Sequence, residues 1–152
     1  MKLQNKFIYA LIYCVFLIAC VRQENNDTGL KETDAINAKQ ETEIHIMIRK
    51  LSNALTLYMK EANPPYTTVE INRLETILNN YLKDLEHTQS KAAGMKIVQE
   101  TVDKLNRLND ECQGSLIETS EREQIAEIII LAGYKKGYNS KEEDITEQWR
   151  EW

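Results

Sequence analysis

Histidine and cysteine, from which metal and nucleophilic sites are often built, are scarce: there are two histidines and three cysteines in 152 residues. Asp84 and His87 have the i, i+3 spacing of one half of a di-iron site, but such helical bundles need two Glu-x-x-His pairs. His45 lies one helical turn from Glu41 and from Arg49, as is typical of a solvated helix edge. We therefore expect no metal and no cofactor.

Sequence motifs of catalysis are absent as well. There is no glycine-rich phosphate loop, no zinc-binding Cys/His set and no nucleophile elbow. Acidic side chains outnumber basic ones by 24 to 19. This excess disfavours binding of nucleic acid or of anionic lipid headgroups through the folded surface. The sequence predicts neither an enzyme, nor a catalytic residue, nor a nucleic-acid partner.

The longest apolar run lies near the N-terminus, in residues 7–19, and follows Lys2 and Lys6. It has the length of a signal-peptide core, about 7–15 residues, whereas a membrane-spanning helix needs roughly 20. The run leads into Leu17-Ile18-Ala19-Cys20. This stretch resembles the lipobox of bacterial lipoproteins, in which an aliphatic residue, a tolerant position and a small residue precede the cysteine that receives lipid.

The resemblance implies that residues 1–19 are a signal peptide and that the Cys20 thiol takes a diacylglyceryl group. The freed amine is then usually acylated too, with a fatty acid such as palmitate, and two or three acyl chains make a stable membrane anchor. The expected location is the bacterial cell membrane or outer membrane, facing the periplasm. Val21 favours the outer membrane, because some bacteria use an Asp there for inner-membrane retention. The alternatives are an ordinary cleaved signal and a short uncleaved anchor.

Cleavage after Ala19 would change the charge and the cysteine content. Residues 1–19 carry two lysines and no acid, so 133 residues remain with 17 basic and 24 acidic side chains, a net charge of −7. Cys14 leaves with the signal and Cys20 is lipidated, so Cys112 has no intrachain partner and is expected to be a buried, unreactive thiol. Stability must come from an apolar core, for which 133 residues suffice.

Polar residues follow the cysteine, and residues 20–33 lack the apolar content to fold, so we expect a flexible tether. The folded domain is predicted over residues 34–152. Its first helix is expected from an N-cap at Asp34 to Ala62, because Asn63-Pro64-Pro65 stops it. Apolar residues recur there at spacings of three and four. The predicted stripe is Ile44, Ile48, Leu51, Leu55, Tyr58 and Ala62.

A second and a third helix follow. Thr67 and Glu70 have the spacing of a capping box, which predicts a helix start. Ser90 or Thr88 is expected to cap a helix that carries Cys112 and is broken by Gly114, although one kinked rod is an alternative to two helices. Gly94 in the early turns indicates a close helix crossing. The predicted stripe of the second helix is Ile71, Leu74, Leu78, Tyr81 and Leu85.

The C-terminal part predicts a buried central helix over residues 121–136, begun by a capping box of Ser120 and Glu123. A short last helix is expected between residues 140 and 152, because Ile145, Trp149 and Trp152 would share one face. The predicted fold is all-α, an up-and-down bundle of about four helices plus a short C-terminal helix.

Two groups of side chains are candidates for binding a partner. Glu118, Glu121 and Glu123 are either helix N-terminal acids, which the helix macrodipole favours, or an acidic face for a basic partner. Trp149 and Trp152 either dock into the bundle or form an exposed anchor for another protein.

The last third of the chain carries a second resemblance. Ile117-Glu-Thr-Ser-Glu-Arg-Glu-Gln-Ile-Ala-Glu-Ile, then Ala132-Gly133, then Glu143-Asp-Ile-Thr-Glu-Gln-Trp-Arg-Glu-Trp152 resembles the C-terminal pattern of small, uncharacterised, all-helical bacterial proteins. The resemblance implies a helical fold and supplies no site.

The leading functional hypothesis is a lipid-anchored, non-enzymatic domain that binds an unknown protein of the cell envelope. One specific version is an immunity-type inhibitor of a basic toxin, because charge complementarity speeds association. The rival hypothesis is a carrier of a small ligand or lipid. Its pocket would be lined by Met47, Tyr58, Met59, Tyr81 and Met95.

Overall fold

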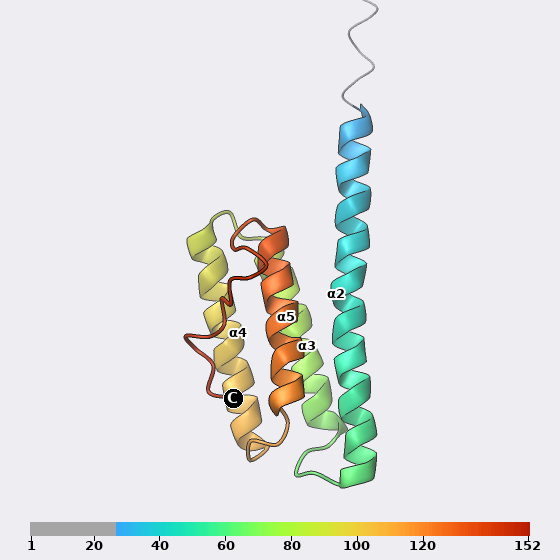
Figure 1. The fold of residues 1–152 in the computed structure, drawn as a ribbon, viewed down its shortest axis with the longest axis vertical. Coiled ribbons are helices and arrows are strands. Elements are labelled where there is room, and N and C mark those ends of the chain that lie inside the picture. Colours follow the sequence, from blue (N-terminus) through green and yellow to red (C-terminus); the bar gives the residue numbers. More distant parts are fainter. Residues whose placement is uncertain (1–26) are drawn as a thin grey trace, which may run out of the picture. The chain divides into compact units, whose positions relative to one another are not determined.

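A computed structural model describes residues 27–152, with side chains from residue 43 onward. The predicted signal peptide, the lipobox-like stretch and Cys20 lie outside the described residues. The described part is all-α, with no strand (Figure 1). Its helices are α2 (Asp27–Ala62), α3 (Thr68–Glu86), α4 (Lys91–Glu111) and α5 (Thr119–Lys135). The chain divides into two compact units, Met1–Gln40 and Glu41–Trp152, and the second contains α3, α4, α5 and the C-terminal part of α2.

Helix α2 begins at Asp27, so the prediction of a start near Asp34 is wrong, and residues 27–33 of the expected tether are helical. Lys and Glu are good helix formers, and a helix that is already nucleated adds residues without needing an apolar face. The other end agrees with the prediction. Asn63 takes a left-handed φ of 50° and donates its N–H to the Met59 carbonyl over 3.2 Å, directly before Pro64.

The predicted α2 stripe is confirmed except at its end. Ile44, Ile48, Leu51 and Leu55 are buried, whereas Tyr58 is 49% exposed and Ala62 is exposed. Helical periodicity identifies a face of a helix, but it does not show where the neighbouring elements stop covering that face.

Helices α3 and α4 are separate, so the kinked rod is excluded. The Thr67 capping box is confirmed: its Oγ1 accepts from the Val69 N–H over 3.1 Å, and its N–H donates to Glu70 Oε2 over 2.8 Å. Ser90 caps α4, since its Oγ accepts from the Ala93 N–H over 3.2 Å. All five residues predicted for the stripe of α3 are buried.

Gly94 marks a close approach, but not a crossing of two helices. A Cβ at this position would lie 2.4 Å from the ring of Tyr138, which follows α5. The Tyr138 hydroxyl also donates to the Thr88 carbonyl over 3.2 Å. The ring therefore ties the segment after α5 to the turn between α3 and α4.

Helix α5 starts at Thr119 after an N-cap at Glu118, and the predicted capping box of Ser120 and Glu123 is wrong. Ser120 Oγ instead donates to Glu121 Oε1 over 2.6 Å. The predicted burial of the helix is confirmed. Its buried residues include Ile125, Ala126, Ile128, Ile129, Ala132 and Gly133.

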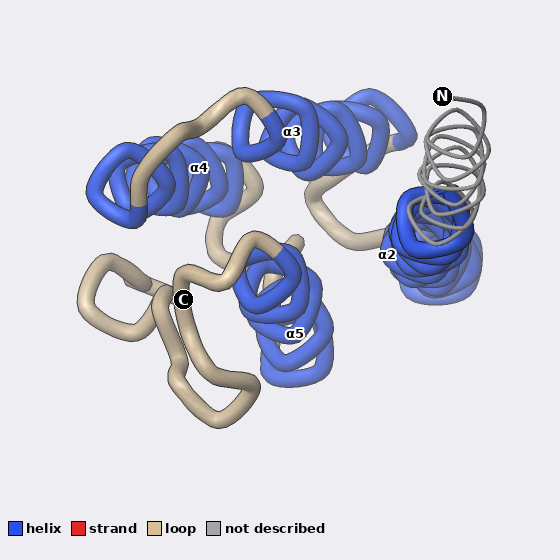
Figure 2. Tube along the Cα trace, turned by 90° about the horizontal axis from the view of Figure 1, so that it is seen from above, coloured by secondary structure: helices blue, strands red, loops and turns tan. Residues whose placement is uncertain are grey.

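The predicted C-terminal helix is wrong, because residues 136–152 form turns and loops that run beside α4 and α5 (Figure 2). Asp144 Oδ1 accepts from the N–H of Thr146 over 2.9 Å and from its hydroxyl over 2.6 Å. Asn106 on α4 donates to the Trp149 carbonyl over 2.8 Å and accepts from the Glu151 N–H over 3.3 Å. In this segment, hydrogen bonds to the side chains of Asp144 and Asn106 replace the backbone hydrogen bonds of a helix.

Candidate functional site

The structure divides the predicted acidic cluster. Glu118 and Glu121 border a pocket at the start of α5, whereas Glu123 borders a different one. We call the first the α5 N-terminal pocket. Its volume is about 330 Å³. It is lined by Tyr58, Tyr66, Ser115, Glu118, Thr119, Ser120 and Glu121.

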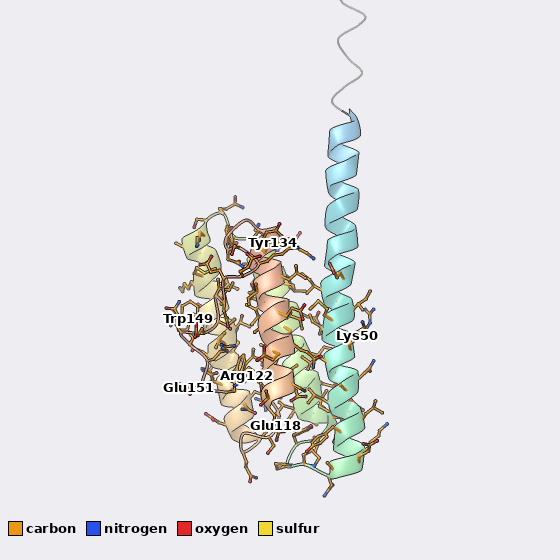
Figure 3. All side chains as sticks on the ribbon, viewed as in Figure 1. Lys50, Glu118, Arg122, Tyr134, Trp149 and Glu151 are labelled. Atoms are coloured by element: carbon orange, nitrogen blue, oxygen red, sulfur yellow. The ribbon has the colours of Figure 1, made fainter. Side chains whose placement is uncertain are left out.

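Four parts of the chain form this pocket. Tyr58 comes from the last turns of α2, and Tyr66 from the loop between α2 and α3. Ser115 lies in the loop between α4 and α5, and the remaining lining residues start α5. Figure 3 shows Glu118 at this end of α5. The pocket is thus built where two connections and two helix ends meet.

Asn109 holds the connection from α4 to α5 in place. Its side chain is buried, and its Oδ1 accepts from the N–H groups of Leu116 over 3.1 Å and of Ile117 over 2.8 Å. Gln113 and Gly114 turn the chain with left-handed φ angles of 58° and 75°. Because Leu116 and Ile117 are anchored by both their backbone and their buried side chains, the position of the next residue, Glu118, is fixed.

The first turn of α5 has no side-chain cap within the described residues. Its first backbone bond runs from the Arg122 N–H to the Glu118 carbonyl over 2.9 Å. The preceding N–H groups of a helix have no acceptor within the helix itself. This end of the pocket therefore combines backbone donors with the carboxylates of Glu118 and Glu121.

Tyr66 supplies the pocket's most distinctive polar group. Its side chain is 3% exposed, and its buried hydroxyl has no hydrogen-bond partner among residues 43–152. Burial raises the pKa of Tyr66 to about 12, helped by the negative charge of Glu121, then by Tyr58 and Glu118. Tyr66 lines the pocket together with Glu121, Tyr58 and Glu118, so these charges lie close to its hydroxyl.

Sequence reasoning missed Tyr66, although a signal for its burial was present. It precedes the N-cap Thr67, and an apolar residue at that position often packs on the fourth helical residue, here Ile71, as a hydrophobic staple. Both Tyr66 and Ile71 are buried. The role of Asn109 had no such signal, because the N–H groups that donate to its side chain lie on the far side of a turn.

The second pocket, of about 340 Å³, has balanced charges. Arg122, Lys141 and Arg150 face Glu123, Glu127 and Asp144. Arg150 Nη2 lies 2.9 Å from Asp144 Oδ2. Burial alone would raise the pKa of Asp144, but hydrogen bonds from Thr146 and the charge of Arg150 hold it below its ordinary value. Glu123 is thus part of a self-compensated ionic surface.

The two tryptophans pack partly buried against the core. Trp149 lies beside α4, away from Glu118 (Figure 3). The Arg150 guanidinium stands 5.7 Å from the centre of the Trp152 ring, and the buried Trp152 Nε1 has no hydrogen-bond partner within the described chain. Trp149 and Glu118 therefore do not share one surface.

The residues named for a carrier pocket take different positions. Tyr81 is fully buried and its hydroxyl donates to the Ile129 carbonyl over 3.0 Å, whereas Tyr58 is half exposed. The three methionines, Met47, Met59 and Met95, pack partly buried against the core. Cys112 is buried and unpaired, and burial is the main cause that raises the pKa of its thiol.

The described residues contain neither a candidate membrane span nor a candidate metal site. None of their helices combines the length and the apolar content that crossing a membrane requires. No cluster of three or more His, Cys, Asp or Glu side chains in this part of the chain could hold a metal ion.

Comparison with known proteins gives no relative. No protein-family model matches the chain, and no curated protein or solved structure is detectably similar to it.

Proposed function

We propose that this chain is a non-enzymatic, lipid-anchored protein of the bacterial cell envelope that acts by binding another protein. The lipobox at Leu17-Ile18-Ala19-Cys20 supports the anchor. The compact unit starts at Glu41, so residues 21–40 separate it from the lipidated Cys20. The partner would meet this unit at the membrane surface.

The α5 N-terminal pocket is the observation that carries the binding function. It places two aromatic rings and two carboxylates around one opening, a combination that suits recognition of a polar side chain. Tyr58 is half exposed beside it. Tyrosine is enriched at protein interfaces, since its ring supplies area and its hydroxyl supplies a hydrogen bond.

Exposed apolar side chains also lie at the end of α2 and at the start of α3, on either side of the loop that carries Tyr66. Leu57 precedes Tyr58 on α2, and Val69 lies in the first turn of α3; each is 60% exposed. Such residues cost little when they stand alone, but near a pocket they add apolar area that a partner can bury. The end of α2 and the start of α3 therefore offer apolar contact area beside the loop that carries Tyr66.

Photo-crosslinking in intact cells tests the proposal. A benzoylphenylalanine is placed at Tyr58 or at Val69, and, as the matched control, at Asn80, which is exposed on α3. We expect a discrete protein adduct from the first two positions and none from Asn80. Absence of an adduct from Tyr58 and Val69 would contradict binding at this end of the unit.

A further inference from the structure

The carboxylates of the α5 N-terminal pocket lack a cation. The lining includes Glu118 and Glu121 but no lysine, arginine or histidine. Within the described part of the chain neither carboxylate forms an ion pair, and Glu121 accepts only the short hydrogen bond from Ser120 Oγ. The neighbouring Glu123 differs, because Arg122 Nε lies 3.6 Å from its carboxylate.

The Tyr66 hydroxyl is a second, independent polar group that lacks a partner. It is buried to 97%, given its 3% exposure, and it makes no hydrogen bond within residues 43–152. A phenolic oxygen can accept a hydrogen bond as well as donate one. The residues that line the pocket therefore include an unpartnered buried acceptor, on Tyr66, as well as the two carboxylates.

Three kinds of side chain compete for such a space. An anion would find the free N–H groups at the start of α5, but Glu118 and Glu121 on the same turn would repel it. An apolar group would remove water from two carboxylates and a hydroxyl without replacing their hydrogen bonds. A cation would pair with the carboxylates, donate to Tyr66 and lie near the aromatic ring of Tyr58.

We propose that the α5 N-terminal pocket receives a lysine or arginine side chain from the partner protein. This inference rests on the proposed function, because it names the chemistry of the partner at the same pocket. The volume of about 330 Å³ is near the lower limit of ligand sites, which suits one long side chain rather than a folded element.

The test is an NMR titration of the ¹⁵N-labelled full chain in non-ionic detergent. Butylammonium chloride represents the lysine side chain, ethylguanidinium chloride the arginine side chain, and sodium acetate is the anionic control. We expect saturable shifts of the Ser115, Thr119, Ser120 and Glu121 amides with one or both cations and none with acetate. Saturation with acetate alone, or with none of the three probes, would overturn the inference.

Variants locate the binding group. The double variant Glu118→Gln/Glu121→Gln should weaken cation binding at least tenfold, whereas Glu123→Gln, on the same helix but outside the pocket, should leave it unchanged. Tyr66→Phe should weaken it less than the double variant. If the double variant loses the dispersed amide spectrum of a folded chain, the single variant Glu121→Gln replaces it. Equal effects of Glu121→Gln and Glu123→Gln would contradict binding in this pocket.

The two proposals fail differently. A negative titration together with a crosslink at Tyr58 removes the basic side chain as the ligand but leaves the protein-binding function. Absence of crosslinks at Tyr58 and Val69 removes the binding function itself, whatever the small cations do.

Discussion

Replacement of Asn109 by alanine should destabilise the fold through the loop that carries Glu118. The variant leaves the buried N–H groups of Leu116 and Ile117, now 3.1 and 2.8 Å from Asn109 Oδ1, without their acceptor. An unsatisfied buried polar group costs about 1–3 kcal/mol. Two such groups predict a loss of at least about 2 kcal/mol in the free energy of unfolding, provided that no water reaches them.

Urea denaturation, followed by the helical circular dichroism signal, measures this loss. The matched control is Asn80→Ala on α3, where the side chain is exposed, and its change should stay within about 0.5 kcal/mol. Asn109→Ala should also weaken cation binding in the α5 N-terminal pocket, because Glu118 loses its fixed position. A loss below about 0.5 kcal/mol for Asn109→Ala would refute the reasoning about this loop.

Three further predictions concern other parts of the chain. Gly94→Ala should lower the thermal unfolding midpoint, because its Cβ would lie 2.4 Å from the Tyr138 ring; an unchanged midpoint would show that the ring moves freely. Glu121→Gln should lower the pKa of Tyr66 from about 12 toward its ordinary value of 10, as measured by phenolate absorbance. In the unchanged chain, the free energy of unfolding should fall as the pH rises from about 10 to 12, because Tyr66 ionises at a lower pH in the unfolded state than in the folded state. Cys20→Ala should abolish labelling by a radioactive fatty acid and release the chain from membranes, whereas retention without label would make residues 7–19 an uncleaved anchor.

The buried face of each helix and the cap of α3 could be predicted from the sequence, because the interactions that decide them are local. In α3, the stripe and the capping box of Thr67 and Glu70 lie within a few turns of each other, and the structure confirms both. In α2, the apolar spacing correctly predicted burial from Ile44 to Leu55 but not at Tyr58. Burial at Tyr58 depends on whether another part of the chain covers the end of the helix.

The C-terminal segment could not be predicted because its conformation depends on distant partners. Ser140, Asp144 and the spacing of Ile145 and Trp149 all suit a helix. The structure uses the Asp144 carboxylate to hold Thr146, and α4 contributes Asn106 to bind the backbone at Trp149. Neither contact leaves a local pattern that sequence reasoning can find.

The candidate site was predicted in part. The acidic residues stood out as a cluster, but only the packing of α5 separates Glu118 and Glu121 from Glu123. Glu123 lines the second pocket, whose basic side chains are those of Arg122, Lys141 and Arg150. Tyr66 follows two prolines in a short loop, so no periodicity marks it. Tyr66 contributes to the site because it lines the same pocket as two carboxylates that are more than 50 residues away in the sequence.

The most direct test of the account compares crosslinking at Tyr58 between two double variants of the chain in intact cells. One replaces the pocket carboxylates, as Glu118→Gln/Glu121→Gln. The other removes two charges from the same helix outside the pocket, as Glu123→Gln/Glu127→Gln. We predict that the adduct disappears in the first variant and persists in the second. Adducts of equal yield in both would contradict a partner held by these carboxylates.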